Sequence, residues 1–276
     1  MKVVLGIDAA WTEKEPSGIA VIVHGGFGWR LVVATSSYGA FLANDDTKAV
    51  TRHRGSVPEP EAIIRATKAK AGRVPDLIAI DMPLSLEAIS GRRAADNHVS
   101  SLYGARHAGT HTPSSTRPGK ISDELRQGFG EIGYPLATSR VEGRSLVEVY
   151  PHPALIELAA ADRRLPYKAS KVSKYWPDLP PRARRLKLID TWKAIVGLLE
   201  ESIEGVDTAL PLPAPDARGF EMKAFEDMLD GVVCAWVGAC ILDDKARAHG
   251  DETAAIWIPE PRPRRCNLQG GFSSTS

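Results

Sequence analysis

Carboxylates stand at or near the ends of three apolar runs, and they are the residues of this sequence best suited to chemistry. Asp8 ends the run 3–7, Asp81 ends the run 77–80, and Glu148 lies within the run 146–149. Such runs predict buried strands. A carboxylate at the end of a buried strand loses hydration energy unless it is paired, hydrogen-bonded or bound to a cation. Three of them in one chain predict a shared site.

A strongly apolar helix predicted over residues 221–248 supplies two more acids. Asp227 and Asp230 are three residues apart, so they lie on one face of this helix. We expect Asp230 to face Asp8, because Asp230 lies on the side of the apolar stripe, and Asp227 to lie one turn nearer the solvent. Taken singly, each acid is readily explained as an ordinary helix-face or strand-end residue. The joint pattern favours one site.

Clustered carboxylates repel one another and raise one another's pKa unless a divalent cation neutralises them. Their oxygen atoms suit Mg²⁺ or Mn²⁺. The candidate metal ligands are therefore Asp8, Asp81, Asp227 and Asp230, and the candidate catalytic residues are Asp8, Asp81, Glu148 and Asp230. Two such ions would activate water and stabilise the leaving oxygen in phosphodiester cleavage.

The elements that must position these acids alternate between strands and helices. Strands are predicted over 2–8, 19–23, 29–34, 77–81, 145–149 and 256–258, and helices over 61–69, 92–102, 154–161, 182–201 and 221–248. Short connections make the first three strands an antiparallel meander. Helical crossovers make the fourth and fifth strands parallel to the first. The predicted fold class is α/β, a mixed sheet flanked by helices.

Two segments differ from this pattern. Residues 82–145 are rich in Gly, Ser, Thr, Pro and Arg, which is typical of a functional insertion or a flexible lid. The tail over 259–276 contains prolines followed by Gly and Ser, and we expect it to be disordered. The chain is therefore predicted to be a single domain over 1–258 with one long insertion.

The arrangement resembles the ribonuclease H-like fold, and most closely its Holliday-junction resolvase branch. In that branch the acids come from the first strand, the fourth strand and an Asp-x-x-Asp pair in the last helix, as Asp8, Asp81 and 227–230 do here. The chain also resembles the bacterial family called domain of unknown function 429, described as a predicted nuclease of this fold. The matching pieces are 6–8, 80–84, 91–96, 148–153, 167–168 and, in the last helix, 223 with 227–230.

The resemblance implies a metal-dependent nuclease that uses Mg²⁺ or Mn²⁺, and resolvases are typically homodimers. Two departures from the resolvase pattern are Asp81, where resolvases typically use Glu, and the additional Glu148. Glu148 could be an extra ligand, a general base, or a buried acid paired with an Arg of the insertion. The candidate substrate-binding residues are Arg92, Arg93, His152, Lys168 and Lys223.

Basic residues concentrate between positions 163 and 187, where nine Lys or Arg and a single acid are interleaved with aromatic residues. This segment is a candidate contact for nucleic acid. A solvated connector explains it equally well. In the insertion, His107 and His111 could position a phosphate or transfer a proton, or they could be ordinary loop residues.

Composition sets broad limits on function. The hydrophobic share of 43% and the charged share of 25% are those of a globular protein with a core, and the net charge of +1 gives no global reason to expect nucleic acid or an anionic membrane. We expect a cytoplasmic protein without a membrane partner, because neither a signal peptide nor a membrane-length apolar run is visible. The three cysteines form no CxxC pair.

Two alternatives to a nuclease stay open. The first is a non-catalytic module of the same fold that binds nucleic acid or another ligand. The second is an actin-like phosphotransferase, which would need glycine-rich phosphate loops after the first and fourth strands. Those glycines are missing here, because Asp8 is followed by Ala9 and Ala10, and Asp81 by Met82 and Pro83.

Overall fold

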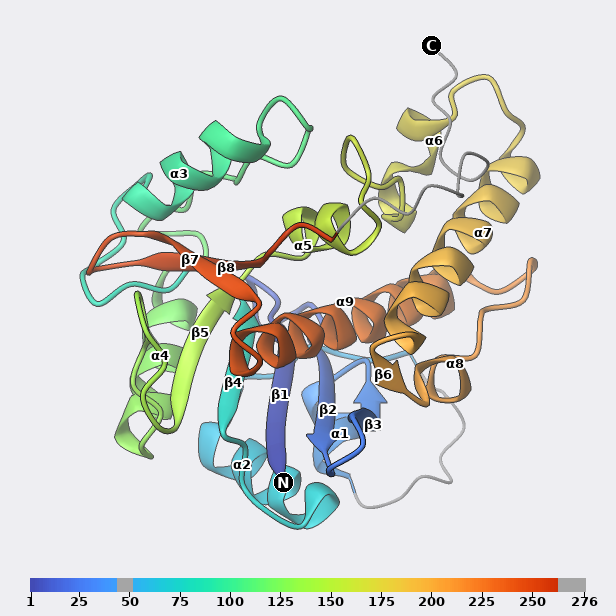
Figure 1. The fold of residues 1–276 in the computed structure, drawn as a ribbon. Helices are drawn as coiled ribbons and strands as arrows, with labels where there is room; N and C mark the ends of the chain where they lie inside the picture. Colours follow the sequence, from blue (N-terminus) through green and yellow to red (C-terminus); the bar gives the residue numbers. More distant parts are fainter. Residues whose placement is uncertain (44–51, 263–276) are drawn as a thin grey trace.

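Strands from both halves of the chain form one mixed sheet in the computed structural model, which describes residues 1–43 and 52–262 (Figure 1). The strands in this part are β1 (Lys2–Asp8), β2 (Gly18–His24), β3 (Trp29–Thr35), β4 (Leu77–Asp81), β5 (Ser145–Val149), β6 (Ile203–Glu204), β7 (Ala246–Gly250) and β8 (Ala255–Pro259). Their order in the sheet is β6-β3-β2-β1-β4-β5-β8-β7.

The strand directions expected for the first five strands are confirmed. β1, β2 and β3 are antiparallel neighbours, and β4 and β5 run parallel to β1. β8 adds a further parallel strand beside β5, while the short β6 and the antiparallel β7 extend the two edges. The sheet is therefore wider than the sequence predicted.

The helices are α1 (Tyr38–Leu42), α2 (Pro60–Ala71), α3 (Ala94–Tyr103), α4 (Lys120–Glu131), α5 (Pro151–Leu158), α6 (Val172–Tyr175), α7 (Pro181–Glu200), α8 (Val206–Ala209) and α9 (Gly219–Leu242), with a 3₁₀ turn over Ala169–Lys171. α9 was expected to reach residue 248. It ends at Leu242 because Asp243, Asp244 and Lys245 end the apolar run, and Asp244 adopts a left-handed conformation with φ of 55°. The residues beyond it form β7 instead.

Helices cover both faces of the sheet. α9 crosses in front of β1 and β2 in Figure 1, and it packs with α5 and α7 on one face. α1, α2 and α4 cover the other face. Because side chains alternate along a strand, Val4 packs on the α9 side and Leu5 on the α2 side. The same alternation decides which acids can meet.

The insertion after β4 contains two helices joined by loops. It contains α3, close to the predicted 92–102, and α4, which was not predicted. The signal for α4 was present, since Ile121, Leu125 and Phe129 recur every fourth residue and pack on the sheet. The expected disordered tail falls mostly on 263–276, which lie outside the described residues. In the part described, no helix is long and apolar enough to span a membrane.

Candidate functional site

The ends of β1 and β4 bring Asp8 and Asp81 together. The two strands are parallel neighbours, and Asp8 and Asp81 are register partners. Ile7 and Ile80, the residues before them, both pack on the α2 side, so alternation directs both carboxylates to the α9 side. The expectation that these strands are adjacent and parallel is confirmed, and it places the acids side by side.

Glycines allow α9 to lie directly on this end of the sheet. A Cβ atom on Gly6 would fall on the backbone of Ala235, and one on Gly18 would fall on the carbonyl group of Asp227. Gly18 is the register partner of Asp8 on β2. Because helix and strands approach so closely, the turn of α9 over residues 226–230 packs against the ends of β1 and β4.

Three acids of α9 point into this region, and all three are buried. Glu226 is 3% exposed, Asp227 1% and Asp230 0%. The expectation that Asp227 lies nearer the solvent was wrong, because the close approach at Gly18 buries the whole turn. Sequence reasoning missed Glu226, although its position four residues before Asp230 places it on the same helix face.

Lys168 neutralises the inner part of this cluster. Its Nζ lies 2.5 Å from Oδ2 of Asp230 and 3.5 Å from Oε1 of Glu226. The hydroxyl group of Tyr167 donates to Oδ1 of Asp230 over 2.9 Å. Burial alone would lower the pKa of Lys168, but the charge of Asp230 and its other anionic neighbours raises that pKa well above its usual value. Lys168, predicted as a substrate-binding residue, is thus held by the protein's own acids.

Lys223 pairs with the outer part of the cluster. Its ammonium group contacts Oδ1 of Asp227 and lies 3.4 Å from Oε1 of Glu226, while half of its side chain is exposed. The second carboxylate oxygen of Asp227, Oδ2, is buried and has no hydrogen-bond partner among the described residues. One oxygen of this acid therefore remains available to a ligand.

Burial and mutual repulsion raise the pKa of the acids at the strand ends. The pKa of Asp8 rises to about 7, chiefly through burial and then through the charge of Asp230. Burial and the charge of Asp8 raise the pKa of Asp81 well above its usual value. Burial also raises the pKa of Asp227 to about 8, although Lys223 opposes the rise. Among the acids that raise the pKa of Asp8, Asp230 has the largest effect, and Asp8 in turn raises the pKa of Asp227.

Asp8 and Asp81 differ from the α9 acids in having no partner. Within residues 1–43 and 52–262, neither carboxylate makes a hydrogen bond or an ion pair, and both residues are partly open to solvent. The expected four-acid metal site is not preformed in this part of the chain, where no group of three or more His, Cys, Asp or Glu residues is arranged to hold a metal. Lys168 and Tyr167 instead hold the two carboxylate oxygens of Asp230, and Lys223 holds one oxygen of Asp227.

Some carboxylate oxygens of the cluster keep no partner among the described residues. Mg²⁺ commonly binds through one or two carboxylates and completes its shell with water and substrate phosphate. Asp8 and Asp81 provide two carboxylates, and the unpartnered Oδ2 of Asp227 is a third donor whose pKa responds to Asp8. Asp8, Asp81 and Oδ2 of Asp227 are therefore the acidic oxygens of this cluster that the described residues leave without a partner.

Glu148 lies apart from this cluster. Its neighbours Val147 and Val149 pack on the α9 side, so alternation turns Glu148 toward the other face. Its Oε2 accepts hydrogen bonds from Nη1 of Arg93 over 2.6 Å and from the backbone of Leu84 over 2.7 Å, and its Oε1 accepts from Nη2 of Arg93 over 2.7 Å. Of the roles considered for Glu148, the buried acid paired with an insertion arginine is the one observed.

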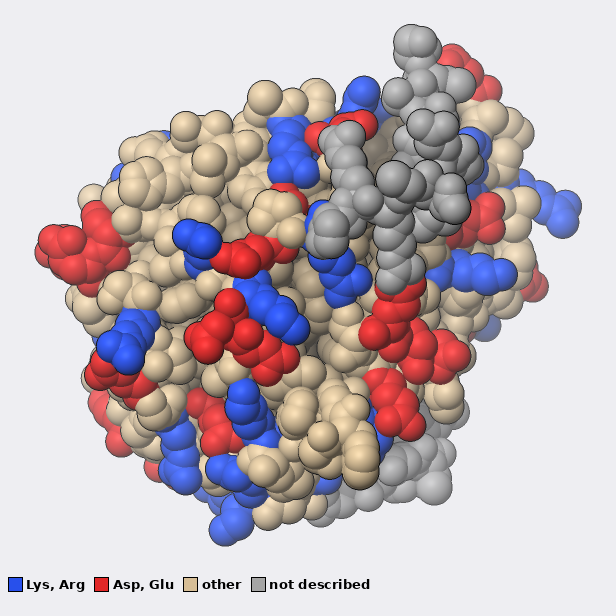
Figure 2. All heavy atoms as spheres, in the orientation of Figure 1, with Lys and Arg blue, Asp and Glu red and all other residues tan. Residues whose placement is uncertain are grey.

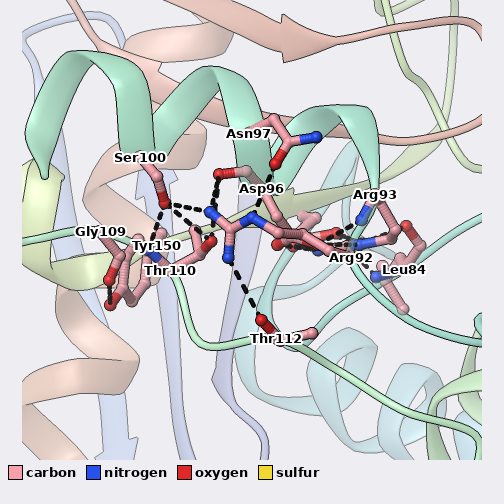
Figure 3. A network of polar contacts seen from close by, with 11 residues as sticks. Leu84, Arg92, Arg93, Asp96, Asn97, Ser100, Gly109, Thr110, Thr112 and Tyr150 are labelled. Carbon is pink, nitrogen blue, oxygen red and sulfur yellow. Dashed lines mark hydrogen bonds and ion pairs between the residues drawn. The ribbon is translucent and has the colours of Figure 1, made fainter.

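Neither arginine of the predicted substrate set is free (Figure 3). Arg93 is 7% exposed and also pairs with Asp96 at 3.0 Å. Arg92 spreads its guanidinium over α3 and the loop that follows, with hydrogen bonds of 2.7 Å to Asn97 and 2.8 Å to the carbonyl group of Asp96. Both arginines therefore hold parts of the insertion together.

His152 lies near the acids but is itself buried, with 8% exposure. Its ring contacts the rings of Tyr150 and Tyr167 edge-on, at centroid distances of 5.3 and 5.5 Å. Burial, and then the charges of Arg164, Lys168 and other basic neighbours, lower its pKa well below the usual value. His152 is therefore neutral at pH 7.

The chain has a net charge of +1. On the face drawn in Figure 2, Lys and Arg alternate with Asp and Glu over most of the surface. Within 163–187, Arg184 and Arg185 hydrogen-bond to backbone carbonyl groups, so they are partly engaged in holding the fold. The local distribution of charge, rather than the total, must guide any functional assignment.

A model of the family described as "Protein of unknown function (DUF429)" matches residues 6–255 of the chain. This match covers all the acids discussed above. No curated protein matches the sequence.

Proposed function

The chain belongs to the DUF429 family of proteins of unknown function, and we propose that it is a divalent-metal-dependent nuclease or related phosphodiester hydrolase. One observation carries the proposal: Asp8 and Asp81 lie side by side at the strand ends without partners, whereas Asp230 and Glu226 beside them are paired. Partly buried carboxylates without a partner are costly, and a bound cation would remove that cost. A site that carries such a cost is a candidate for function.

The residues of the chain divide the work in this proposal. Asp8, Asp81 and Oδ2 of Asp227 would hold Mg²⁺ or Mn²⁺, which supplies water activation and charge stabilisation at the phosphate. Lys168 and Lys223 limit the repulsion that the α9 acids exert on an incoming phosphate.

The same proposal includes a ribonuclease H-like arrangement of β1–β5. Two features support it: the strand directions, and acids contributed by the first strand, the fourth strand and the last long helix. Two features differ from the resolvase pattern. Glu148 forms an ion pair with Arg93, and Asp230 forms an ion pair with Lys168.

A non-catalytic binding module is the second candidate function, and one observation favours it. Among the described residues no three-acid group is ready to hold a metal, because lysines already neutralise the α9 acids. Such a module would have no need of a metal ion, so the response to Mn²⁺ separates the two candidates.

Melting temperatures with and without Mn²⁺ test the proposal before any substrate is known. A ligand that binds only the folded state raises the melting temperature. We expect Mn²⁺ to stabilise the wild type and the control Asp190→Asn, whose side chain is exposed on α7, but not Asp8→Asn or Asp81→Asn. Cleavage of labelled DNA, RNA and four-way junctions with Mn²⁺ should show the same dependence. A wild type indifferent to Mn²⁺ and inactive on every substrate would favour the binding module.

A further inference from the structure

Basic side chains that have no acidic partner gather beside the acid pair. Arg164 and Lys171 flank the Lys168 segment, and His111 comes from the insertion. None of the three forms an ion pair with an acid among the described residues, whereas Lys168 between them is fully paired. Arg164 and Lys171 thus carry positive charges that no ion pair within residues 1–43 and 52–262 neutralises.

Contacts bring the insertion and this segment together. The backbone N–H of Arg164 donates to the carbonyl group of Arg106 over 2.8 Å, which joins the segment to the insertion. The charges of Lys171, Arg164 and the nearby Arg117 lower the pKa of His111, after burial, so His111 lies within reach of the same cations. Both histidine rings near these cations are neutral at pH 7 and can donate an N–H without adding charge.

Two buried nitrogen atoms in this group lack hydrogen-bond partners among the residues described. They are Nε of Arg164 and Nδ1 of His152, and the His152 side chain is more than nine-tenths buried. An unsatisfied buried polar group costs about 1–3 kcal/mol, and more when it is charged. Phosphate oxygens, which accept several hydrogen bonds from arginine and imidazole N–H groups, would satisfy both.

The group lies next to the acids rather than elsewhere on the surface. Tyr150 directly follows β5, and after burial the charges of Asp81, Arg164 and Lys168 are the main influences on its pKa. Tyr150 also touches His152 edge-on. Tyr150 therefore lies near both Asp81 and these cations.

We propose that Arg164, Lys171, His111 and His152 form a binding site for a phosphate group, and that this group belongs to the substrate, next to the phosphate that reacts at Asp8 and Asp81. The second half of this proposal rests on the proposed function; the phosphate site itself does not. Two cations and two neutral imidazoles suit a phosphate monoester, which carries a charge near −2 at neutral pH.

Calorimetry in EDTA tests the phosphate site without any metal. The probes are inorganic phosphate, a 5′-phosphorylated thymidine dinucleotide and the same dinucleotide without that phosphate. We expect the phosphorylated dinucleotide to bind the full-length protein most tightly. Replacing both cations, Arg164→Gln with Lys171→Gln, should weaken its binding about tenfold or more, as expected for lost charge-assisted hydrogen bonds.

The matched control is Arg163→Gln with Arg182→Gln, which removes two exposed charges from the same stretch of chain. It should change the affinity less than threefold, an effect of the order that screened surface charges have. Equal losses in both double variants, or no phosphate binding by the wild type, would overturn the site. His111→Ala, in an exposed loop, gives a second readout should the Arg164 variant fold poorly.

The experiment separates this inference from the proposed function. Asp8→Asn should keep its phosphate binding in EDTA, because Asp8 is not part of the phosphate site. A protein that binds phosphate in EDTA but ignores Mn²⁺ and cleaves nothing would retain the site and lose the nuclease. A protein that responds to Mn²⁺ and cleaves substrate, but whose Arg164 and Lys171 variant binds phosphate normally, would retain the nuclease and lose the site.

Discussion

At the scale of single residues, two ammonium groups stand where crowded carboxylates would otherwise need a metal ion. Lys168 reaches Asp230 and Glu226, and Lys223 reaches Asp227. Neither ammonium group forms an ion pair with Asp8 or Asp81 among the described residues. Burial and the charges of neighbouring acids therefore raise the pKa values of these two carboxyl groups. The fold thus tolerates the cluster without metal but leaves its two strand-end acids destabilised, which is the condition that a divalent ion would relieve.

The raised pKa of Asp8 predicts how stability changes with pH in the absence of metal. Between about pH 4 and its folded pKa of about 7, the folded state holds a proton that the unfolded state has released, so stability falls as pH rises through this window. Asp8→Asn removes this loss. We expect the variant to melt about 5 °C above the wild type at pH 8 in EDTA, and the difference to vanish near pH 4. A variant that is less stable at pH 8 would mean that Asp8 has a partner.

The two lysines are not equivalent, and substituting each should show it. Lys168→Met leaves Asp230 and Glu226 buried without a cation, so we expect a loss of about 3–5 kcal/mol in the free energy of unfolding. Lys223→Met removes a half-exposed partner, and its cost should be about 1 kcal/mol. Urea denaturation at pH 7 in EDTA measures both. Equal costs would contradict the assignment of Lys168 as the inner partner.

At the scale of elements, the site depends on how closely α9 approaches the sheet. Gly6→Ala would place a methyl group against the backbone of α9 at Ala235. We expect a loss of about 1–3 kcal/mol or more, because backbone cannot move aside as a side chain can. The shift in melting temperature caused by Mn²⁺ should shrink as well, since α9 would lift from the strand ends.

Gly197→Ala is the matched control for that change. Gly197 lies in α7 with open space around its Cα, so a methyl group meets nothing there. In a helix interior this substitution should stabilise the protein by about 0.5–1 kcal/mol. Equal effects at the two positions would show that the approach of α9 does not constrain residue 6.

The insertion is fastened to the sheet through Arg93, and this predicts a structural rather than catalytic phenotype. Arg93→Met leaves Glu148 and Asp96 buried and unpaired, which should cost about 3–5 kcal/mol in unfolding free energy. The neighbouring Arg92→Met removes mostly exposed contacts and should cost about 1 kcal/mol. Folded Arg93→Met should still be stabilised by Mn²⁺. Loss of that response at unchanged stability would instead give Arg93 a role in the site.

Helices and strands with a clear pattern of apolar residues could be predicted from the sequence. Elements that form because of tertiary contacts could not. The runs ending at Asp8 and Asp81 identified two adjacent strands because buried parallel strands are continuously apolar. β7 was hidden, since ARAHG has no strand pattern and exists through pairing with β8. Glu148 was placed on the correct strand, but its role depended on Arg93, 55 residues away in sequence.

At the scale of the whole molecule, charge is balanced overall and uneven locally. The net charge is +1, and the visible surface mixes both signs. Basic groups without partners are concentrated near Arg164 and Lys171, beside the acid pair, while several other cations of 163–187 are bound by the protein itself. We therefore expect a substrate to be bound through few phosphate groups at one place, and not along an extended basic surface.

The salt dependence of binding measures how many phosphates are gripped. For single-stranded DNA the slope of log affinity against log salt is about −0.7 per phosphate neutralised, so a site for two or three phosphates predicts a slope of about −2. If all nine basic residues of 163–187 contacted the strand, the slope would be about −6. Fluorescence anisotropy of a labelled 20-nucleotide strand between 50 and 200 mM salt in EDTA distinguishes the two slopes.

The double variant Arg164→Gln with Lys171→Gln is the control for this measurement. Its slope should be shallower than that of the wild type, because two cations that neutralise phosphates are lost. A steep slope that this double variant leaves unchanged would place the contact on the outer part of the segment instead.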